Sequence, residues 1–313
     1  MITPVPSRAF PKMAAPDFTR DLDLTLEELN ALLDLTAQVK GHPEQYSRAL
    51  AGRYASLLFE KPSLRTRLTF ELAVKQLGGD SVVSSGPIGG REPIKDVARN
   101  LDRWTQVIVA RTFSQRTIDE LARWSSVPVI NALSDLYHPC QALADLFTLK
   151  EHRGTLAGLK MAFVGDGNNV ANSLMITCAR LGVNFAIATP RGYEPKTRIV
   201  NQALELAAET GANLTAAHDA EATVSGADAV YTDVWASMGQ EEEAAQRRVD
   251  FQPYQVNEQL MALAKPDAIF MHCLPAKRGE EVTDAVIESK QSAVFDQAEN
   301  RLHAQKALLL MML

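Results

Sequence analysis

Residues 54–79, YASLLFEKPSLRTRLTFELAVKQLGG, contain a short apolar run, a polar turn and an amphipathic segment in that order. The first run, Tyr54–Phe59, has the length of a buried strand. After the turn, apolar residues recur at helical spacing from Phe70 to Leu77, and two glycines stop the pattern. The stretch therefore predicts a strand, a turn and a helix, which is the repeating unit of an α/β fold.

The same alternation continues along the chain. Other segments that predict buried strands, most of them separated by helical patterns, are 107–110, 127–130, 160–164, 185–188, 229–232 and 268–272. Strands that are apolar throughout are typical of parallel sheets with helices on both faces. A composition shift over residues 150–158 (KEHRGTLAG) marks the best domain boundary. We expect an α/β chain of two domains, 1–150 and 151–313, each a mainly parallel sheet flanked by helices.

The composition excludes several classes of protein. The chain has 313 residues, 46% of them hydrophobic and 22% charged, which is ordinary for a globular protein. Its net charge of −6 provides no overall positive field that would attract nucleic acid or an anionic membrane. No apolar run approaches the roughly 18–20 residues of a membrane span. The N-terminal segment lacks the apolar core of a secretory signal, so we expect a cytoplasmic protein, with a short organellar leader as the open alternative.

The cysteine pattern argues against two stabilising devices. Cys140, Cys178 and Cys273 are odd in number and have no CxxC spacing. This pattern disfavours both a disulfide framework and a structural zinc site. We therefore expect three reduced thiols and no metal.

The polar turn after the first predicted strand is a candidate anion site. SLRTR (residues 63–67) begins a helix, so free backbone N–H groups, two hydroxyls and two guanidinium groups converge there. This favours a phosphate ligand over a capped helix with solvated arginines. Arg111, directly after strand 107–110, is a second candidate, although a single arginine after a strand is more often the partner in a surface ion pair. The segment lacks GxxxxGK[ST], which excludes a nucleotide P-loop.

GDGNN (residues 165–169) follows a predicted strand and invites a dinucleotide hypothesis. The third glycine position of GxGxxG is Val170, however, and strand 185–188 ends without the acid that binds a ribose. A nicotinamide cofactor is therefore disfavoured. The two asparagines can instead bind a carboxylate or an amine, or they can form an ordinary tight turn.

Three further polar segments lie where ligands of α/β sheets collect. In DVWASMG (233–239), Asp233 supplies an anion for an ammonium group, which favours amino-acid binding; the alternative is a turn before a solvated charged helix over 241–248. In HPCQ (138–141), His138 and Gln141 lie one turn apart and can face the same ligand. The alternative is that the histidine only precedes a helix whose start is fixed by Pro139. In HCLP (272–275), Cys273 faces the cleft or is inert core.

Together, SLRTR, HPCQ, DVWASMG and HCLP resemble the motifs of the aspartate and ornithine carbamoyltransferase family, over nearly the whole chain. DxxxSMG combined with HCLP is similar to its ornithine-specific branch. The resemblance implies transfer of the carbamoyl group of carbamoyl phosphate to the δ-amine of L-ornithine, giving L-citrulline and phosphate in arginine biosynthesis, without a cofactor. It also implies a homotrimer and an active site in the interdomain cleft. Residues 1–150 would bind carbamoyl phosphate and 151–313 ornithine, with a C-terminal helix over about 298–313 packed on the first domain.

The resemblance also implies a role for individual residues. Carbamoyl phosphate would contact Ser63, Leu64, Arg65, Thr66, Arg111, His138, Gln141, Cys273, Leu274 and Arg301. Ornithine would contact Asn169, Asp233, Ser237 and Met238. Arg111 and His138 would stabilise charge on the carbonyl oxygen. Cys273, with an ordinary thiol pKa of about 8.5, would handle the proton that the amine loses.

Two residues depart from the family pattern, and three other functions compete with the one implied. Leu64 stands where threonine is usual, and Pro87 stands where a glutamine or similar residue is usual in a loop that reaches a neighbouring subunit. The competing functions are carbamoyl transfer to putrescine or an N-acylornithine, a nicotinamide-dependent oxidoreductase, and a non-catalytic binding protein. The direction of the reaction in the cell stays open.

Overall fold

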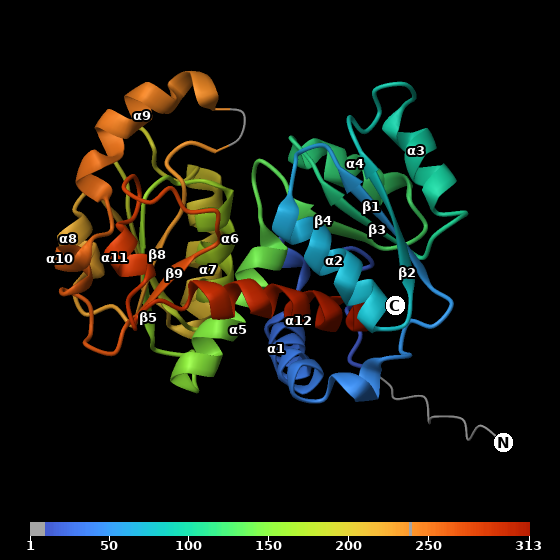
Figure 1. The fold of residues 1–313 in the computed structure, drawn as a ribbon, viewed down its shortest axis with the longest axis horizontal. Coiled ribbons are helices and arrows are strands. Elements are labelled where there is room, and N and C mark those ends of the chain that lie inside the picture. The colour runs from blue at the N-terminus through green and yellow to red at the C-terminus, as the bar shows by residue number, and fades with distance from the viewer. Residues whose placement is uncertain (1–9, 238–239) are drawn as a thin grey trace.

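The computed structural model describes residues 10–237 and 240–313, which form two parallel sheets side by side (Figure 1). The first sheet has the strand order β2-β1-β3-β4. Its strands are β1 (Tyr54–Phe59), β2 (Asp80–Ser85), β3 (Val107–Arg111) and β4 (Val129–Leu133). The second sheet has the order β7-β6-β5-β8-β9. Its strands are β5 (Lys160–Val164), β6 (Asn184–Ala188), β7 (Leu214–Ala217), β8 (Ala229–Thr232) and β9 (Ile269–His272).

The register of each sheet brings the ends of its strands to one edge. At the end of β1, Phe59 pairs with Ser85 of β2 on one side and with Arg111 of β3 on the other. In the second sheet, Thr232 at the end of β8 pairs with His272 at the end of β9. Because all the strands run parallel, the polar segments that follow them meet along these two edges.

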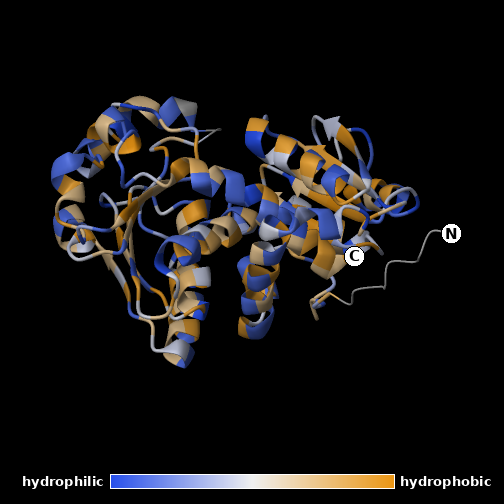
Figure 2. Cartoon of the chain, turned by 60° about the horizontal axis from the view of Figure 1, so that its bottom comes forward, coloured by the Kyte–Doolittle hydropathy of each residue, from blue (hydrophilic) through white to orange (hydrophobic). Residues whose placement is uncertain are grey.

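Helices cover the faces of both sheets. The chain passes in order through α1 (Leu26–Gly41), α2 (Leu64–Gln76), α3 (Ile94–Leu101), α4 (Gln115–Trp124), α5 (Pro139–Arg153), α6 (Asn169–Arg180), α7 (Thr197–Thr210), α8 (Ala220–Val224), α9 (Ala244–Phe251), α10 (Glu258–Met261), α11 (Asp284–Ile287) and α12 (Val294–Met312). Short 3₁₀ helices occupy Asp21–Asp23, Pro43–Tyr46, Glu241–Glu243 and Gln252–Tyr254. Figure 2 shows the strands mainly in the hydrophobic colour and the helices in both colours, as expected when a helix buries only one face.

The last helix crosses from the second sheet to the first. Figure 1 shows α12 between α2 and α1, and it also packs against α5. The residues near its C-terminus, from Ala307 to Met311, are buried in the largest hydrophobic core. Its first turns lie at the junction of the two sheets and bring Gln297 and Arg301 there, both buried.

The two-domain α/β architecture predicted from the sequence is confirmed. All six further strand segments occur, although β4 begins two residues after the predicted 127–130 segment. The sequence did not predict β2 or β7. Both lie at a sheet edge and are largely exposed, so they lack the continuous apolar run that marks a buried strand. Within the described ranges, no helix combines the length and apolar character needed to cross a membrane.

Candidate active site

A cavity of about 320 Å³ lies where the carboxyl ends of the two sheets face each other. Its walls come from the segments that follow β1, β3, β4, β5, β8 and β9, together with α12. The lining residues are Lys61, Pro62, Ser63, Leu64, Arg65, Thr66, Arg111, Leu133, His138, Asn169, Val170, Asp233, Val234, Ser237, Cys273, Leu274, Pro275 and Arg301.

The structure brings the predicted site residues together, with two exceptions. Gln141 is not among the residues that line the cavity; it is buried one turn inside α5, where its Nε2 donates to Asp145 at 2.7 Å. Met238 lies outside the described residues. Every other predicted site residue lines this cavity, although the residues span nearly 240 positions of sequence.

Three arginines give the cavity a strongly cationic wall. Arg111 and Arg301 are buried and Arg65 is partly buried, yet none of them forms an ion pair with a carboxylate in the described part of the chain. Arg301 donates from Nη2 to the Thr66 hydroxyl at 2.5 Å. Burial, with the neighbouring Arg301 charge second, lowers the pKa of Arg111 to about 10. A buried cation without a paired anion is costly, so this wall is built to receive an anionic ligand.

The N-terminus of α2 adds uncharged donors to the same wall. Ser63 is the N-cap residue, and its side chain makes no capping hydrogen bond. The first backbone N–H groups of the helix therefore remain available beside Arg65, at the positive end of the helix dipole. Backbone amides, hydroxyls and guanidinium groups in one place are a suitable arrangement for a phosphate.

His138 is held neutral at the start of α5. Burial, then the positive charges of Arg301 and Arg111, lower its pKa well below the ordinary histidine value. Its backbone N–H donates to the Ser173 hydroxyl of α6 at 2.9 Å, and its ring Nδ1 has no hydrogen-bond partner among residues 10–237 and 240–313. A neutral imidazole in this position can donate one hydrogen bond to a ligand without adding positive charge.

Cys273 and Asp233 form a hydrogen-bonded pair on the opposite wall. The thiol donates to Asp233 Oδ1 at 3.1 Å, and Asn168 Nδ2 donates to Asp233 Oδ2 at 2.8 Å. Burial, with the Asp233 charge second, raises the pKa of Cys273 well above the ordinary thiol value. The expectation that Cys273 handles a proton with an ordinary thiol pKa is therefore wrong. The thiol stays protonated and acts as a donor that orients the carboxylate.

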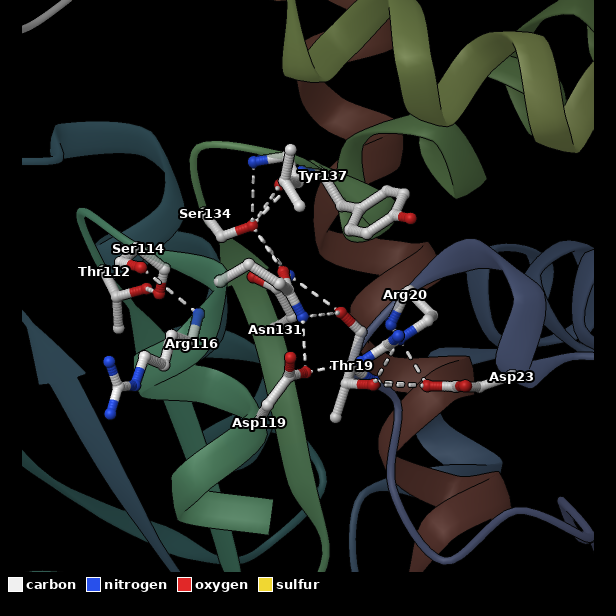
Figure 3. Close-up of polar contacts among 12 residues, drawn as sticks. Thr19, Arg20, Asp23, Thr112, Ser114, Arg116, Asp119, Asn131, Ser134 and Tyr137 are labelled. Atoms are coloured by element: carbon white, nitrogen blue, oxygen red, sulfur yellow. Dashed lines mark hydrogen bonds and ion pairs between the residues drawn. The ribbon is translucent and has the colours of Figure 1, made fainter. Parts of the chain in front are cut away.

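A buried polar network supports the loop between β4 and α5, which carries His138 (Figure 3). Asn131 Nδ2 donates to the Thr19 carbonyl at 2.9 Å, and the Ser134 hydroxyl accepts from Tyr137 N at 3.1 Å. The Ser134 hydroxyl in turn donates to Gln115 Oε1 at 2.6 Å. These contacts involve buried groups, so they restrict the loop more strongly than exposed hydrogen bonds would.

One face of α6 joins this loop to the second sheet. Asn169 Nδ2 donates to the Ser134 carbonyl at 2.7 Å. Ser173 and Thr177 donate to the buried carboxylate of Asp21 at 2.5 and 3.2 Å. Asn169, which was predicted to bind a ligand, thus also joins the two walls of the cavity, and it lines the cavity itself.

An ion pair that the sequence did not predict supports the loops after β5 and β8. Arg247 Nη1 donates to Asp166 at 2.9 Å and to the Trp235 carbonyl at 3.0 Å. Burial raises the pKa of Asp166 to about 6, although Arg247 opposes that shift. The alternative of a fully solvated helix over 241–248 is wrong at Arg247, which is buried. Within a run of charges, nothing in the sequence distinguished this arginine from its exposed neighbours.

Neither a metal nor a dinucleotide finds a suitable site in the described residues. Asp233, His272 and Cys273 lie close enough to share an ion. Both ring nitrogens of His272 are already used, however, by Glu281 at 3.1 Å and by Leu274 N at 2.8 Å. At the glycine-containing turn, Asn168 Oδ1 accepts from the backbone N–H groups of Val170 and Ala171 in the first turn of α6, which removes two of the donors that a pyrophosphate needs.

Two family models together match nearly the whole chain. The model described as "Aspartate/ornithine carbamoyltransferase, carbamoyl-P binding domain" matches residues 17–151, and "Aspartate/ornithine carbamoyltransferase, Asp/Orn binding domain" matches residues 157–312.

Individual relatives agree with these matches. An ornithine carbamoyltransferase of Parafrankia sp. is 52% identical over 303 residues, which cover 95% of this chain and 96% of that protein. The protein called "Ornithine carbamoyltransferase, anabolic" of Pyrococcus furiosus is 50% identical, over 92% of this chain and 93% of its own. The solved structure of ornithine carbamoyltransferase from Pyrococcus furiosus superposes with a TM-score of 0.93 at 48% identity, covering 96% of this chain and 97% of that one. This chain therefore belongs to the aspartate/ornithine carbamoyltransferase family.

Proposed function

We propose that this chain transfers the carbamoyl group of carbamoyl phosphate to the δ-amine of L-ornithine, giving L-citrulline and phosphate. The observation that carries the proposal is that one cavity contains both a cationic and an anionic wall. Three arginines without carboxylate partners among the described residues form the first, and the carboxylate of Asp233 lies on the other. The arginines match a phosphate, and Asp233 matches the α-ammonium group of an amino acid. The names of the relatives support the same reaction.

In this proposal carbamoyl phosphate binds to the first domain, residues 1–150. The phosphate contacts the N-terminus of α2 and the arginines, and the carbamoyl end lies toward His138 and α12. The contacting residues that line the cavity are Ser63, Leu64, Arg65, Thr66, Arg111, His138, Cys273, Leu274 and Arg301. Gln141, which lies one turn from His138 and does not line the cavity, is the further contact that we propose for the carbamoyl end. The Leu64 side chain is 70% exposed, so this residue contributes its backbone N–H, and the loss of the usual threonine hydroxyl leaves that contact intact.

Ornithine binds to the second domain, residues 151–313, through Asn169, Asp233, Ser237 and Met238. Asp233 is already oriented by Cys273 and Asn168, so little freedom is lost when it pairs with the α-ammonium group. Asn169 Nδ2, which already donates one N–H to the Ser134 carbonyl, donates its second N–H to the α-carboxylate. This arrangement directs the δ-amine toward the first domain.

The chemistry follows from placing both substrates in one cavity. The neutral δ-amine attacks the carbamoyl carbon, a C–N bond forms, and the bond to the phosphate oxygen breaks. Negative charge that develops on the carbonyl oxygen is stabilised by Arg111, Arg301 and neutral His138. The proton that the amine loses ends on the departing phosphate. Cys273 contributes to catalysis as an S–H donor beside the reacting groups rather than as a base.

The proposed assembly is a homotrimer. Leu64, Leu68 and Leu72 form an exposed apolar row along α2, with exposed fractions of 70%, 47% and 44%. Such a row is unusual on a helix that faces only water. Because Leu64 also lines the cavity, a neighbouring subunit on this row would lie next to the active site.

We place the reaction in the cytoplasm and in the biosynthetic direction. The three cysteines are free, which fits a reducing compartment. The Pyrococcus furiosus relative that is called anabolic supports the direction toward citrulline.

The amine specificity tests the proposed reaction directly. We expect kcat/KM for L-ornithine to exceed that for putrescine or an N-acylornithine by about 100-fold or more. Putrescine lacks the α-carboxylate, and an N-acylornithine lacks the α-ammonium group that pairs with Asp233. The measurement is product formation with carbamoyl phosphate and each amine. Preferential use of an acylornithine or of putrescine would identify a related carbamoyltransferase, and no product with any amine would identify a binding protein.

Arg65→Ala should raise KM for carbamoyl phosphate by roughly 100-fold, because a charged hydrogen-bond donor to the phosphate is lost. Arg67→Ala is the matched control: Arg67 lies on the same helix but is exposed and paired with Glu71, so we expect a change within about twofold. Asp233→Asn should instead raise KM for ornithine. Equal effects of Arg65→Ala and Asp233→Asn on both substrates would contradict the assignment of separate subsites.

The raised pKa of Cys273 predicts slow alkylation. A thiol whose pKa lies well above its ordinary value is protonated at pH 8, so iodoacetamide should label Cys273 much more slowly than glutathione at that pH. Removing the Asp233 charge lowers the thiol pKa, so Asp233→Asn should label faster than the unmodified protein. Mass spectrometry of the Cys273 peptide measures both rates, and rapid labelling of the unmodified protein at pH 8 would show that the thiolate is present.

Charges placed on the apolar row of α2 should break the assembly. We expect Leu68→Glu combined with Leu72→Glu to shift the mass in sedimentation equilibrium from that of a trimer to that of a monomer. Leu204→Glu is the control, because Leu204 has a comparable exposed fraction of 46% but lies on α7 of the second domain. A trimer that persists with both charges on α2 would place the subunit contact elsewhere.

A further inference from the structure

A buried carboxylate behind the cavity wall has no role in the reaction as proposed above. Asp145, in the middle of α5, is fully buried. Its Oδ1 accepts from Gln141 Nε2 at 2.7 Å and from Gln297 Nε2 at 2.6 Å, and its Oδ2 accepts from the Tyr231 hydroxyl at 3.0 Å. It forms no ion pair with any lysine, arginine or histidine of the described chain. Three neutral donors, rather than a cation, therefore hold it.

Asp145 lies close to the reacting groups. Burial and the Asp233 charge are the main causes that raise the pKa of Cys273, and Asp145 adds to the same shift. Burial raises the pKa of Asp145 itself to about 7, while Arg301 is among the groups that lower it. Asp145 accepts from Gln297, whose Oε1 accepts from the backbone N–H of His272, the residue before Cys273 in the cavity wall. The carboxylate is therefore two hydrogen bonds behind that wall.

The hydrogen bonds determine which way each amide faces. Gln297 Oε1 accepts from the backbone N–H of His272 at 2.9 Å, so Gln297 must present its Nε2 to Asp145. Asp145 Oδ1 is therefore an acceptor, whether or not a proton is bound to Oδ2. Gln141 shares Oδ1 and must also present its Nε2, which turns its Oε1 away from Asp145.

That oxygen is the unusual atom of the cluster. Gln141 is 1% exposed, and its Oε1 has no hydrogen-bond partner within residues 10–237 and 240–313. A buried acceptor without a donor costs about 1–3 kcal/mol, so a ligand donor is expected to complete it. Gln141 lies one turn along α5 from His138, which lines the cavity. The NH₂ of a carbamoyl group is a donor of the required kind.

We propose that Asp145 is a positioning residue that holds the Gln141 amide with its oxygen toward the NH₂ of the carbamoyl group. The inference rests on the proposed function. Without Asp145, the Gln141 amide can rotate and present its own NH₂ to the NH₂ of the substrate, donor against donor. The orientation thus selects carbamoyl phosphate over an acyl phosphate, such as acetyl phosphate, whose methyl group donates no hydrogen bond.

The test separates this role from general support of the fold, which Asp145 also provides by joining α5 to β8 and α12. Asp145→Ala should raise KM for carbamoyl phosphate by about 10- to 100-fold. The inhibition constants of inorganic phosphate and acetyl phosphate should change by less than about twofold, because neither ligand forms a hydrogen bond with Gln141. Asp145→Asn keeps an acceptor for both glutamines and should retain KM within about threefold. Tyr231→Phe removes the hydrogen bond on the other oxygen and is the matched control, with an unchanged KM.

A double-mutant cycle completes the test. If Asp145 acts through Gln141, Asp145→Ala should add little to the KM of Gln141→Ala. Additive effects, or a parallel loss of phosphate binding, would overturn the inference. Should Asp145→Ala fail to fold, Asp145→Ser, whose side chain is too short to hold both amides, takes its place in the same measurements. If the unmodified protein forms no citrulline, the proposed function is refuted. If it forms citrulline and Asp145→Ala has the same KM for carbamoyl phosphate as the unmodified protein, this inference alone is refuted.

Discussion

The burial of positive charge at the junction of the two sheets is the constraint on which the site depends. Arg111 and Arg301 are nearly inaccessible to water, and among the described residues no carboxylate neutralises them. Such charges are tolerated only if the surrounding structure holds them in place and a ligand supplies the missing anion. The same constraint explains His138, since a third positive charge beside two arginines would be unfavourable, and the imidazole is held neutral.

The remainder of the site keeps the two walls at a defined separation. On one side of the cavity, α6 reaches across to the loop before His138 through Asn169 and Ser173. Behind the cavity, Asp145 joins α5 to β8 and α12. Both contacts are made by buried polar groups, whose hydrogen bonds are directional and costly to break. Polar contacts of this kind determine orientation more closely than apolar packing alone, and orientation is the main requirement for bringing two substrates together.

Much of the fold could be predicted from local pattern. A strand buried on both faces is apolar throughout, so β1, β3, β5 and β8 were recognisable without tertiary information. The edge strands β2 and β7 were not, because their exposed residues carry no such signal. The motifs also indicated the site chemistry, since a helix start rich in arginine and serine, or an aspartate after a strand, has a limited set of uses.

The sequence by itself determined which chemical groups the site contains and that they follow the strands of two parallel sheets. Only the tertiary structure decided how those groups behave. Burial beside Asp233 keeps the Cys273 thiol protonated, so it is a hydrogen-bond donor and not a base. Arg247, which belongs to a run of charged residues in the sequence, is buried and forms an ion pair with Asp166. The oxygen of Asp145 that two glutamines share determines the orientation of Gln141. Protonation and orientation depend on neighbours that are distant in sequence, so local pattern cannot specify them.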